Sequence, residues 1–374
     1  MSTRKIILGS LVATLVASSA FANTGRIAVM GTADPFGLVS GTDGEHGSLF
    51  VDDNYNIFYN PSYANDFKNW VSVERSNGLI TTGGTAPTTA FGGAEGGFVA
   101  SAMNLSFGAF MNRGTGVTPY FSNAARQGLT PIDLIIAGDT GFKWGLGFSF
   151  GADKNAPAGV SGAGFAGVAR YFDINIGAQV AGLDPFIHLS LANSNPDPTS
   201  HVETRPRDMD FGLKYHFGEW TPFAMFYTSK ADTSLAVSNT NYGVGLGRST
   251  KIAEGANLAY ALSYWRAPSA GADGSGWSIL PIDISAEADL ASWITARAGV
   301  VYNLVNRIGG STNQANTTTG RMGVTLHFQK VAFDFVVAGN NNLTEAAAVS
   351  GNIDSRNFDL GSGTFSRASL TYTW

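Results

Sequence analysis

The chain of 374 residues contains no cysteine, so no disulfide can hold it together. Charged residues are also scarce, because Asp, Glu, Lys and Arg make up only 14% of the sequence, against roughly 25% in soluble domains. Beyond residue 22 there is no run of about twenty apolar residues that could cross a bilayer as a helix. These absences disfavour a disulfide-stapled secreted domain, an ordinary soluble domain and a helical membrane protein.

Apolar residues are nevertheless abundant, at 44% of the chain, and they are spread along it by alternation. Aromatic residues reach 12% and glycine occurs 47 times, together with many Asn, Ser and Thr residues. Alternation with a period of two predicts strands that have one apolar and one polar face. The composition therefore predicts an all-β protein with many twisted strands and polar loops.

The N-terminus has the three parts of an export signal. Met1 to Lys5 is basic, Ile6 to Ala20 is apolar, and Ala20-Phe21-Ala22 is a small-x-small cleavage site. We therefore expect residues 1–22 to be a signal peptide; as a membrane anchor the apolar stretch is too short. Without it, 21 basic residues face 28 acidic ones, a net charge of −7. That charge disfavours nucleic acid as a partner.

The last ten residues form an alternating pattern that ends on an aromatic ring. Ala368, Leu370 and Tyr372 are apolar, the residues between them are polar, and the chain stops at Trp374. This segment resembles the final strand of bacterial outer-membrane β-barrels. The resemblance implies that it is the signal read by the barrel assembly machinery. The alternative is an edge strand of a soluble β-sandwich.

Alternating segments recur from about residue 142 to the end of the chain. Short connections such as 182–185, 217–220, 290–293 and 328–331 alternate with long polar ones such as 193–206, 306–319 and 341–363. This rhythm is typical of tight periplasmic turns opposite long extracellular loops. The twelve expected strands are 142–152, 164–181, 184–194, 207–217, 220–229, 239–248, 255–266, 277–289, 292–304, 319–328, 331–340 and 364–374.

Two further strands, at 70–75 and 97–111, bring the expected count to fourteen, an even number as in bacterial barrels. A strand at 131–139, together with a division of 97–111, would instead give sixteen. We expect a closed antiparallel transmembrane β-barrel formed by residues 68–374, with fourteen strands and with sixteen as the main alternative. Tryptophans near strand ends predict girdles at the membrane interface; they are Trp70, Trp144, Trp220, Trp265, Trp277, Trp293 and Trp374.

Residues 23–67 differ from the rest of the chain. They hold many large apolar side chains, too many for a disordered linker. Asn60-Pro61 lies in a stretch, residues 59–62, that resembles the Asn-Pro-Ala box in the N-terminal hatch of outer-membrane long-chain fatty acid transporters. The same stretch also resembles the major outer-membrane proteins of predatory deltaproteobacteria. We expect a plug at the periplasmic side of the barrel, in which Asp52 and Asp53 meet basic lumen residues such as Arg297 or Arg321. The alternative for Asn60-Pro61 is a simple turn.

Assigning the apolar face of each strand to lipid leaves a set of ionisable side chains on the opposite face. A charge on the lipid face would cost roughly 2–4 kcal/mol near the midplane, so we expect these residues to line the pore. The expected pore-lining residues are Asp208, Asp210, Lys214, Asp283, Glu287, Arg297, Arg321, His327, Asp334 and Arg367.

A wide barrel with a charged inner wall predicts a porin-like channel of the bacterial outer membrane for passive diffusion of small polar solutes. Two alternatives stay open: a fatty-acid-transporter-like barrel for hydrophobic compounds, and a structural or surface-interaction protein without transport. We expect no enzymatic activity, no cofactor and no metal site. The expected partners are outer-membrane lipid, lipopolysaccharide and small solutes, and homo-oligomerisation is left open.

The C-terminal strand gives the first testable prediction. Deletion of Trp374, or its change to Asp, should reduce the amount of barrel assembled in the outer membrane, because the aromatic end of the signal is lost. Export across the inner membrane should be unchanged. Fractionation of periplasm and outer membrane measures both quantities, and normal outer-membrane levels of the variant would contradict the assignment.

Overall fold

The computed structural model describes residues 24–34, 47–80, 94–113, 132–153, 169–196, 203–204, 207–230, 238–268, 276–307, 317–339 and 364–374. The expected signal peptide, residues 1–22, lies outside these described residues. In the described part of the chain, no helix is long and apolar enough to cross a membrane.

The described residues form three short helices and seventeen strands. The helices are α2 (Thr24–Met30), η3 (Asn54–Phe58) and η4 (Pro61–Asn65). The strands are β1 (Trp70–Ile80), β2 (Ala94–Ala102), β3 (Leu105–Met111), β4 (Ile132–Asp139), β5 (Lys143–Asp153), β6 (Ala169–Gln179), β7 (Leu183–Pro196), β8 (Glu203–Thr204), β9 (Arg207–Tyr215), β10 (Trp220–Lys230), β11 (Ser238–Ala253), β12 (Ala256–Ala267), β13 (Trp277–Ala291), β14 (Ile294–Arg307), β15 (Thr317–Phe328), β16 (Val331–Gly339) and β17 (Thr364–Thr373).

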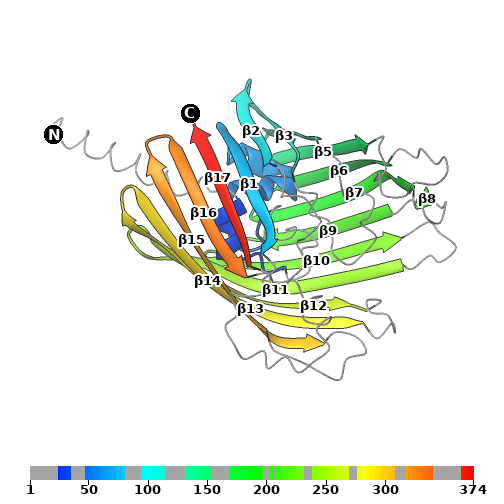
Figure 1. The fold of residues 1–374 in the computed structure, drawn as a ribbon. Coiled ribbons are helices and arrows are strands. Elements are labelled where there is room, and N and C mark those ends of the chain that lie inside the picture. Colours follow the sequence, from blue (N-terminus) through cyan, green and yellow to red (C-terminus); the bar gives the residue numbers. More distant parts are fainter. Residues whose placement is uncertain are drawn as a thin grey trace.

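The strands close into one antiparallel barrel (Figure 1), as the sequence predicted. Closure occurs at β1, which pairs with β2 on one side and with β17 on the other. Trp70 lies opposite Thr373 in this pair, and the Trp374 N–H donates to the Asn69 carbonyl at 3.1 Å. Each of these strands therefore has a hydrogen-bonded neighbour on both sides, as a sheet in lipid requires.

Sixteen strands make up the closed wall, because the two-residue β8 only pairs with the last two residues of β7. The expected count of fourteen is wrong, and the alternative of sixteen is confirmed. β4 is a strand, and the segment 97–111 is divided by a turn at Met103-Asn104. These two residues have φ angles of 51° and 64°, the backbone of a two-residue hairpin turn. The usual Asn-Gly or Asp-Gly signal is missing there, which is why the turn is hard to predict.

Side chains alternate between the outer and inner surfaces of the wall as predicted. On β17, Leu370 and Tyr372 are 39% and 42% exposed, whereas Thr371 between them is 1% exposed. On β9, Phe211 points outward and its neighbour Asp210 is buried inside. The outer surface is therefore apolar and the inner surface polar, the arrangement that suits a membrane-spanning barrel.

The short turns lie at the barrel end that holds the C-terminus (Figure 1). The turn between β6 and β7 has Ala181 and Gly182 at φ 52° and 82°, again a two-residue hairpin turn. Helices α2, η3 and η4 lie inside the ring of strands (Figure 1). α2 contacts β13 to β17, and η4 contacts β3 to β6, so the N-terminal segment bridges much of the inner wall.

Three of the predicted interface tryptophans are exposed on the outer surface. Trp220, Trp293 and Trp374 are 36%, 53% and 49% exposed, and Trp144 is half-buried. The backbone of Trp277 begins β13, but its side chain lies outside the described residues. The role of these rings at a headgroup boundary stays a prediction.

The outer surface gives a stability prediction. Leu262 is 50% exposed within β12, so Leu262→Arg should lower the free energy of unfolding in lipid by roughly 2–4 kcal/mol. Leu290, beside a short turn and 67% exposed, is the matched control: Leu290→Arg should cost only about 0–1 kcal/mol near the interface. Denaturant unfolding in vesicles measures both. Equal costs at the two positions would argue against a lipid-facing belt.

Candidate functional site

The described residues 24–34 and 47–67 lie inside the barrel, and we call them the plug. Their apolar side chains are fully enclosed: Ile27, Met30, Leu49 and Ile57 are each 0% exposed. The described residues of the N-terminal segment therefore lie buried inside the barrel. The candidate functional site is the interface between this plug and the inner wall.

Glycines on the inner wall make room for the backbone of the plug. A Cβ atom at Gly145 of β5 would overlap the carbonyl carbon of Pro61, and one at Gly177 of β6 would overlap the side-chain oxygen of Asn60. Any larger residue at either position would force the plug away from the wall. The wall is therefore shaped to receive this segment at close range.

The Asn60-Pro61 turn is bound to that wall by hydrogen bonds. The Asn60 Oδ1 accepts the N–H of Ser62 at 3.2 Å and so caps η4, while its Nδ2 donates to the Ala178 carbonyl at 3.3 Å. Asn65 Nδ2 donates to another wall carbonyl, that of Gly138, at 3.1 Å. Asn60 and Pro61 thus begin the short helix η4, and the same residues dock the plug on the wall.

Arg26 of α2 links the two parts of the plug to the wall. Its Nη1 lies 2.9 Å from an Asp53 carboxylate oxygen, and its Nη2 lies 2.7 Å from Oε1 of Glu287 on β13. A second bond, from Nε to Oε2 of Glu287 at 2.9 Å, makes this pair bidentate. Removing one partner of such a buried pair costs about 3–5 kcal/mol, because the other charge is left uncompensated.

The partner of Asp53 differs from the expected one. Arg297 instead contacts Glu287 at 3.0 Å and Asp334 at 2.9 Å. Asp53 pairs instead with Arg26, which belongs to the plug itself and lies in the mostly apolar stretch 24–30. The sequence had predicted a basic residue of the wall as its partner. Plug and wall thus share one chain of alternating charges, from Asp53 to Asp334.

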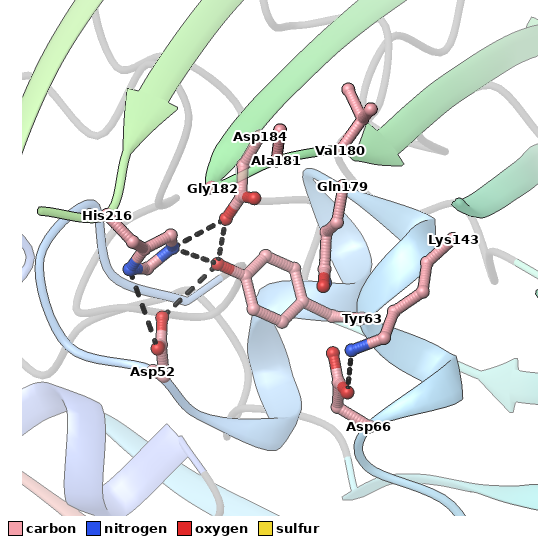
Figure 2. A pocket seen from close by; sticks show the side chains of 10 residues that line it. All are labelled: Asp52, Tyr63, Asp66, Lys143, Gln179, Val180, Ala181, Gly182, Asp184 and His216. Carbon is pink, nitrogen blue, oxygen red and sulfur yellow. Dashed lines mark hydrogen bonds and ion pairs between the residues drawn. The ribbon is translucent and has the colours of Figure 1, made fainter. Parts of the chain in front are cut away.

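Asp52 belongs to a second polar cluster, at the end with the short turns (Figure 2). Its Oδ1 lies 3.4 Å from Nζ of Lys214, a fully buried base on β9. The basic lumen residue that Asp52 meets is thus Lys214, and neither Arg297 nor Arg321. The hydroxyl of Tyr63 donates to Oδ2 of Asp184 at 2.5 Å and lies 3.3 Å from Nε2 of His216. This cluster therefore joins η4 to β7 and β9.

The ionisation of Asp52 follows from this surrounding. Partial removal from water raises the pKa of Asp52, whose side chain is still 50% exposed, but the charges of Lys214 and His216 more than offset that effect, so that its pKa lies below the ordinary value. The carboxylate therefore stays charged at neutral pH.

The other predicted pore-lining residues all belong to the inner wall, and several of them contact another side chain of the wall. Arg321 lies 3.5 Å from Asp283, and Arg367 lies 3.4 Å from Glu74. Further contacts link Asp210 with His188 at 2.9 Å and His327 with Thr295 at 2.9 Å, and Asp208 is buried on the inner face of β9. Most of these side chains are buried, whereas Arg321 and His327 are partly exposed. Their role along a solute path stays a prediction.

Two tryptophans correct the predicted aromatic girdle. Trp70 and Trp265 are 0% exposed and point into the barrel. Trp70 packs against Tyr55 of η3 and Phe110 of β3, with ring centroids 6.1 Å and 5.5 Å apart. The Trp265 Nε1–H donates to the carbonyl of Ala33 at 2.9 Å. Both rings serve the plug interface because the strand register turns them inward, whereas position near a strand end alone suggested the membrane surface.

Sequence reasoning missed several contributors to this site. Arg26, Glu74 and Asp184 carry plug contacts, yet none was singled out. Tyr55 donates from its hydroxyl to Oε2 of Glu74 at 2.9 Å. The sequence did contain a signal for two of them. Arg26 is a base followed by apolar residues of a helix, and Glu74 is a carboxylate on the inner face of the first strand. Their partners lie too far along the chain for spacing to reveal them.

The described residues contain no group of three or more His, Cys, Asp or Glu side chains that could hold a metal ion. No family model matches the chain, and no curated protein does so.

Solved structures do show similarity to this chain. A bacterial polysaccharide outer membrane secretin is 6% identical, with 82% of this chain and 98% of that one covered and a TM-score of 0.48. The Ralstonia pickettii toluene transporter TbuX is 12% identical over 94% of this chain and 98% of its own, with a TM-score of 0.42. A Pseudomonas aeruginosa FadL homologue is 11% identical over 92% and 99%, with a TM-score of 0.40. No residue role is transferred from them.

The glycine contacts give a prediction about the seating of the plug. Gly177→Val should push Asn60 away from β6 and destabilise the seated plug by about 1–3 kcal/mol. The rate at which a protease supplied at the short-turn end cleaves residues 50–63 should then rise roughly 5–150-fold, because this rate follows the fraction of molecules whose plug is released. Ala178→Val, whose side chain points away from the plug on the same strand, is the control. Equal cleavage of the two variants would contradict close packing at Gly177.

Proposed function

We propose that this protein is an outer-membrane channel for small polar solutes and that the plug closes it in the state described. The observation that carries the proposal is the lumen itself. A barrel of sixteen strands is too wide for wall side chains alone to fill. The space is taken by a segment that is outside the strand pairing, so its departure would leave the closed wall intact.

The chemistry of the interface supports a plug that can leave. Besides apolar packing, its contacts with the wall include ion pairs such as Arg26 with Glu287 and Lys214 with Asp52. Water can solvate each of these polar groups once the plug moves. A wall with charges of both signs then suits polar solutes and ions.

The proposed location is the outer membrane of Gram-negative bacteria. The apolar outer surface, the basic and apolar leader at residues 1–22 and the aromatic end at Trp374 support it. Lipid and lipopolysaccharide would then contact the wall, and the barrel assembly machinery would read β17. The proposal assigns the chain no catalytic role.

One observation favours transport of hydrophobic compounds as a second candidate. Tyr55, Phe58, Trp70 and Phe110 form an aromatic cluster inside the barrel, with Phe58 and Phe110 centroids 4.8 Å apart. Release of the plug would uncover part of this cluster. Ion conductance separates the two candidates, because a route for apolar compounds needs no continuous aqueous passage.

A disulfide lock tests whether the plug closes the channel. A Cβ built on Gly323 of β15 would lie 3.1 Å from Cγ2 of Val29 in α2, which suits a disulfide between the two positions. The chain has no other cysteine to interfere. In a Val29→Cys, Gly323→Cys variant, oxidation should lower the plug-released fraction roughly 30-fold or more, and reduction should restore conductance.

Planar-bilayer recordings of the refolded variant, with and without reductant, measure the effect. Each single cysteine variant is a control and should not respond to reductant. Conductance that persists unchanged in the fully oxidised protein would mean that α2 does not close the passage. If neither redox form nor the unmodified protein conducts ions, the channel proposal fails in favour of the second candidate or a structural role.

A further inference from the structure

The two parts of the plug are attached to the wall in different ways. η3 and η4 pack through large apolar side chains, since Tyr55, Phe58 and Tyr63 all belong to the main buried core of the barrel. In this core the rings of Tyr55 and Phe58 lie against Trp70 and Phe110 of the wall. The stabilisation grows with the apolar area removed from water. Departure of η3 and η4 would therefore expose a large aromatic surface.

α2 is held differently. It lies against β13 to β17, where a separate small apolar cluster joins it to Val336 of β16. Polar contacts complete this interface: Arg26 binds Glu287, and the Ser285 hydroxyl donates to the Met30 carbonyl at 2.7 Å. Water can replace the polar partners. Departure of α2 therefore exposes less apolar surface than departure of η3 and η4 would.

The length of chain that tethers each part also differs. η4 ends at Asn65, four residues before β1 begins at Trp70, and so short a connection keeps η4 close to the start of the wall. α2 is joined to the rest of the plug by residues 35–46, and a chain of this length can extend to about 40 Å. The expected cleavage after Ala22 leaves one residue on its other side. Chain length therefore allows α2 to leave while η4 stays.

We propose that the channel opens by departure of α2 alone, while η3 and η4 stay seated, and that solutes then pass along β13 to β16. This inference rests on the proposed channel function and identifies the moving part and the passage. The space that α2 vacates has the width of a helix with its side chains, about 10 Å. The aromatic cluster around η3 stays covered, so the passage suits ions and polar solutes.

Departure of α2 changes the charge of the space it leaves. Arg26 lies between Glu287 of the wall and Asp53, the residue that caps η3, at 2.7 Å and 2.9 Å. When Arg26 leaves, both carboxylates face the passage, and Glu287 keeps Arg297 as a partner at 3.0 Å. Fixed negative charge in a narrow wet passage attracts cations. The open channel should therefore favour cations over anions.

Two disulfide locks, one for each part of the plug, test the proposal. The Val29→Cys, Gly323→Cys lock holds α2. A matched lock holds η4, because a Cβ on Gly147 of β5 would lie 3.2 Å from Cγ of Pro61, which again suits a disulfide. Oxidation of a Pro61→Cys, Gly147→Cys variant should leave ion conductance unchanged, whereas oxidation of the α2 lock should abolish it.

Planar-bilayer recordings with and without reductant measure both variants, and counting free thiols shows that each lock has closed. Loss of conductance in the oxidised η4 lock would mean that η4 moves too, and the inference would fall while the channel stands. Conductance that persists in the oxidised α2 lock also overturns it. If the unmodified protein and both reduced variants conduct nothing, the proposed function fails and this inference fails with it.

Ion selectivity is an independent measurement that needs no lock. In a KCl gradient, Glu287→Gln should move the reversal potential towards the chloride equilibrium potential, because the passage loses a negative charge. The reversal potential does not depend on how often the channel opens, so a weaker α2 seat does not affect it. Asp133→Asn is the matched control, a buried carboxylate of β4, which η4 contacts; its reversal potential should be that of the unmodified protein. An unchanged reversal potential in Glu287→Gln would contradict a passage along β13.

Discussion

The structure depends on the hydrogen bonds that join the first strand to the last. In a hydrocarbon environment a free sheet edge leaves backbone N–H and C=O groups without partners, so a spanning sheet must close on itself. Trp70 to Asn77 pair residue by residue with Ser366 to Thr373 to achieve this. Because closure supplies the constraint, a chain without cysteine can hold a single defined shape.

Closure with sixteen strands creates the interior that the rest of the molecule must fill. The plug fills it with two kinds of contact that have different roles. Glycines such as Gly145 and Gly177 determine where the backbone can approach the wall. Charged groups such as Arg26 and Lys214 determine which register of the plug is correct, because a displaced segment would leave buried charges without partners.

The fold was largely predictable because alternation is a local property, and each strand reports its own two faces. The strand count failed at Met103-Asn104, where backbone conformation, rather than residue type, makes the turn. The inner-face carboxylates and bases were predictable for the same local reason. Their partners were not, since the pair Arg26–Glu287 joins residues 261 positions apart, and strand register alone cannot indicate which wall residues the N-terminal segment will contact.

The pairing of Arg26 with Glu287 also constrains the order of folding. The plug is synthesised before any strand, yet its partners on β9 and β13 come much later in the chain. Contacts of such long sequence separation form late, because the loop entropy between them must be lost first. The N-terminal segment therefore docks only after the barrel has closed. Until then its apolar residues are exposed and need protection from aggregation. The topology therefore favours a chaperone that covers residues 47–67 on the way to the membrane, before the barrel closes.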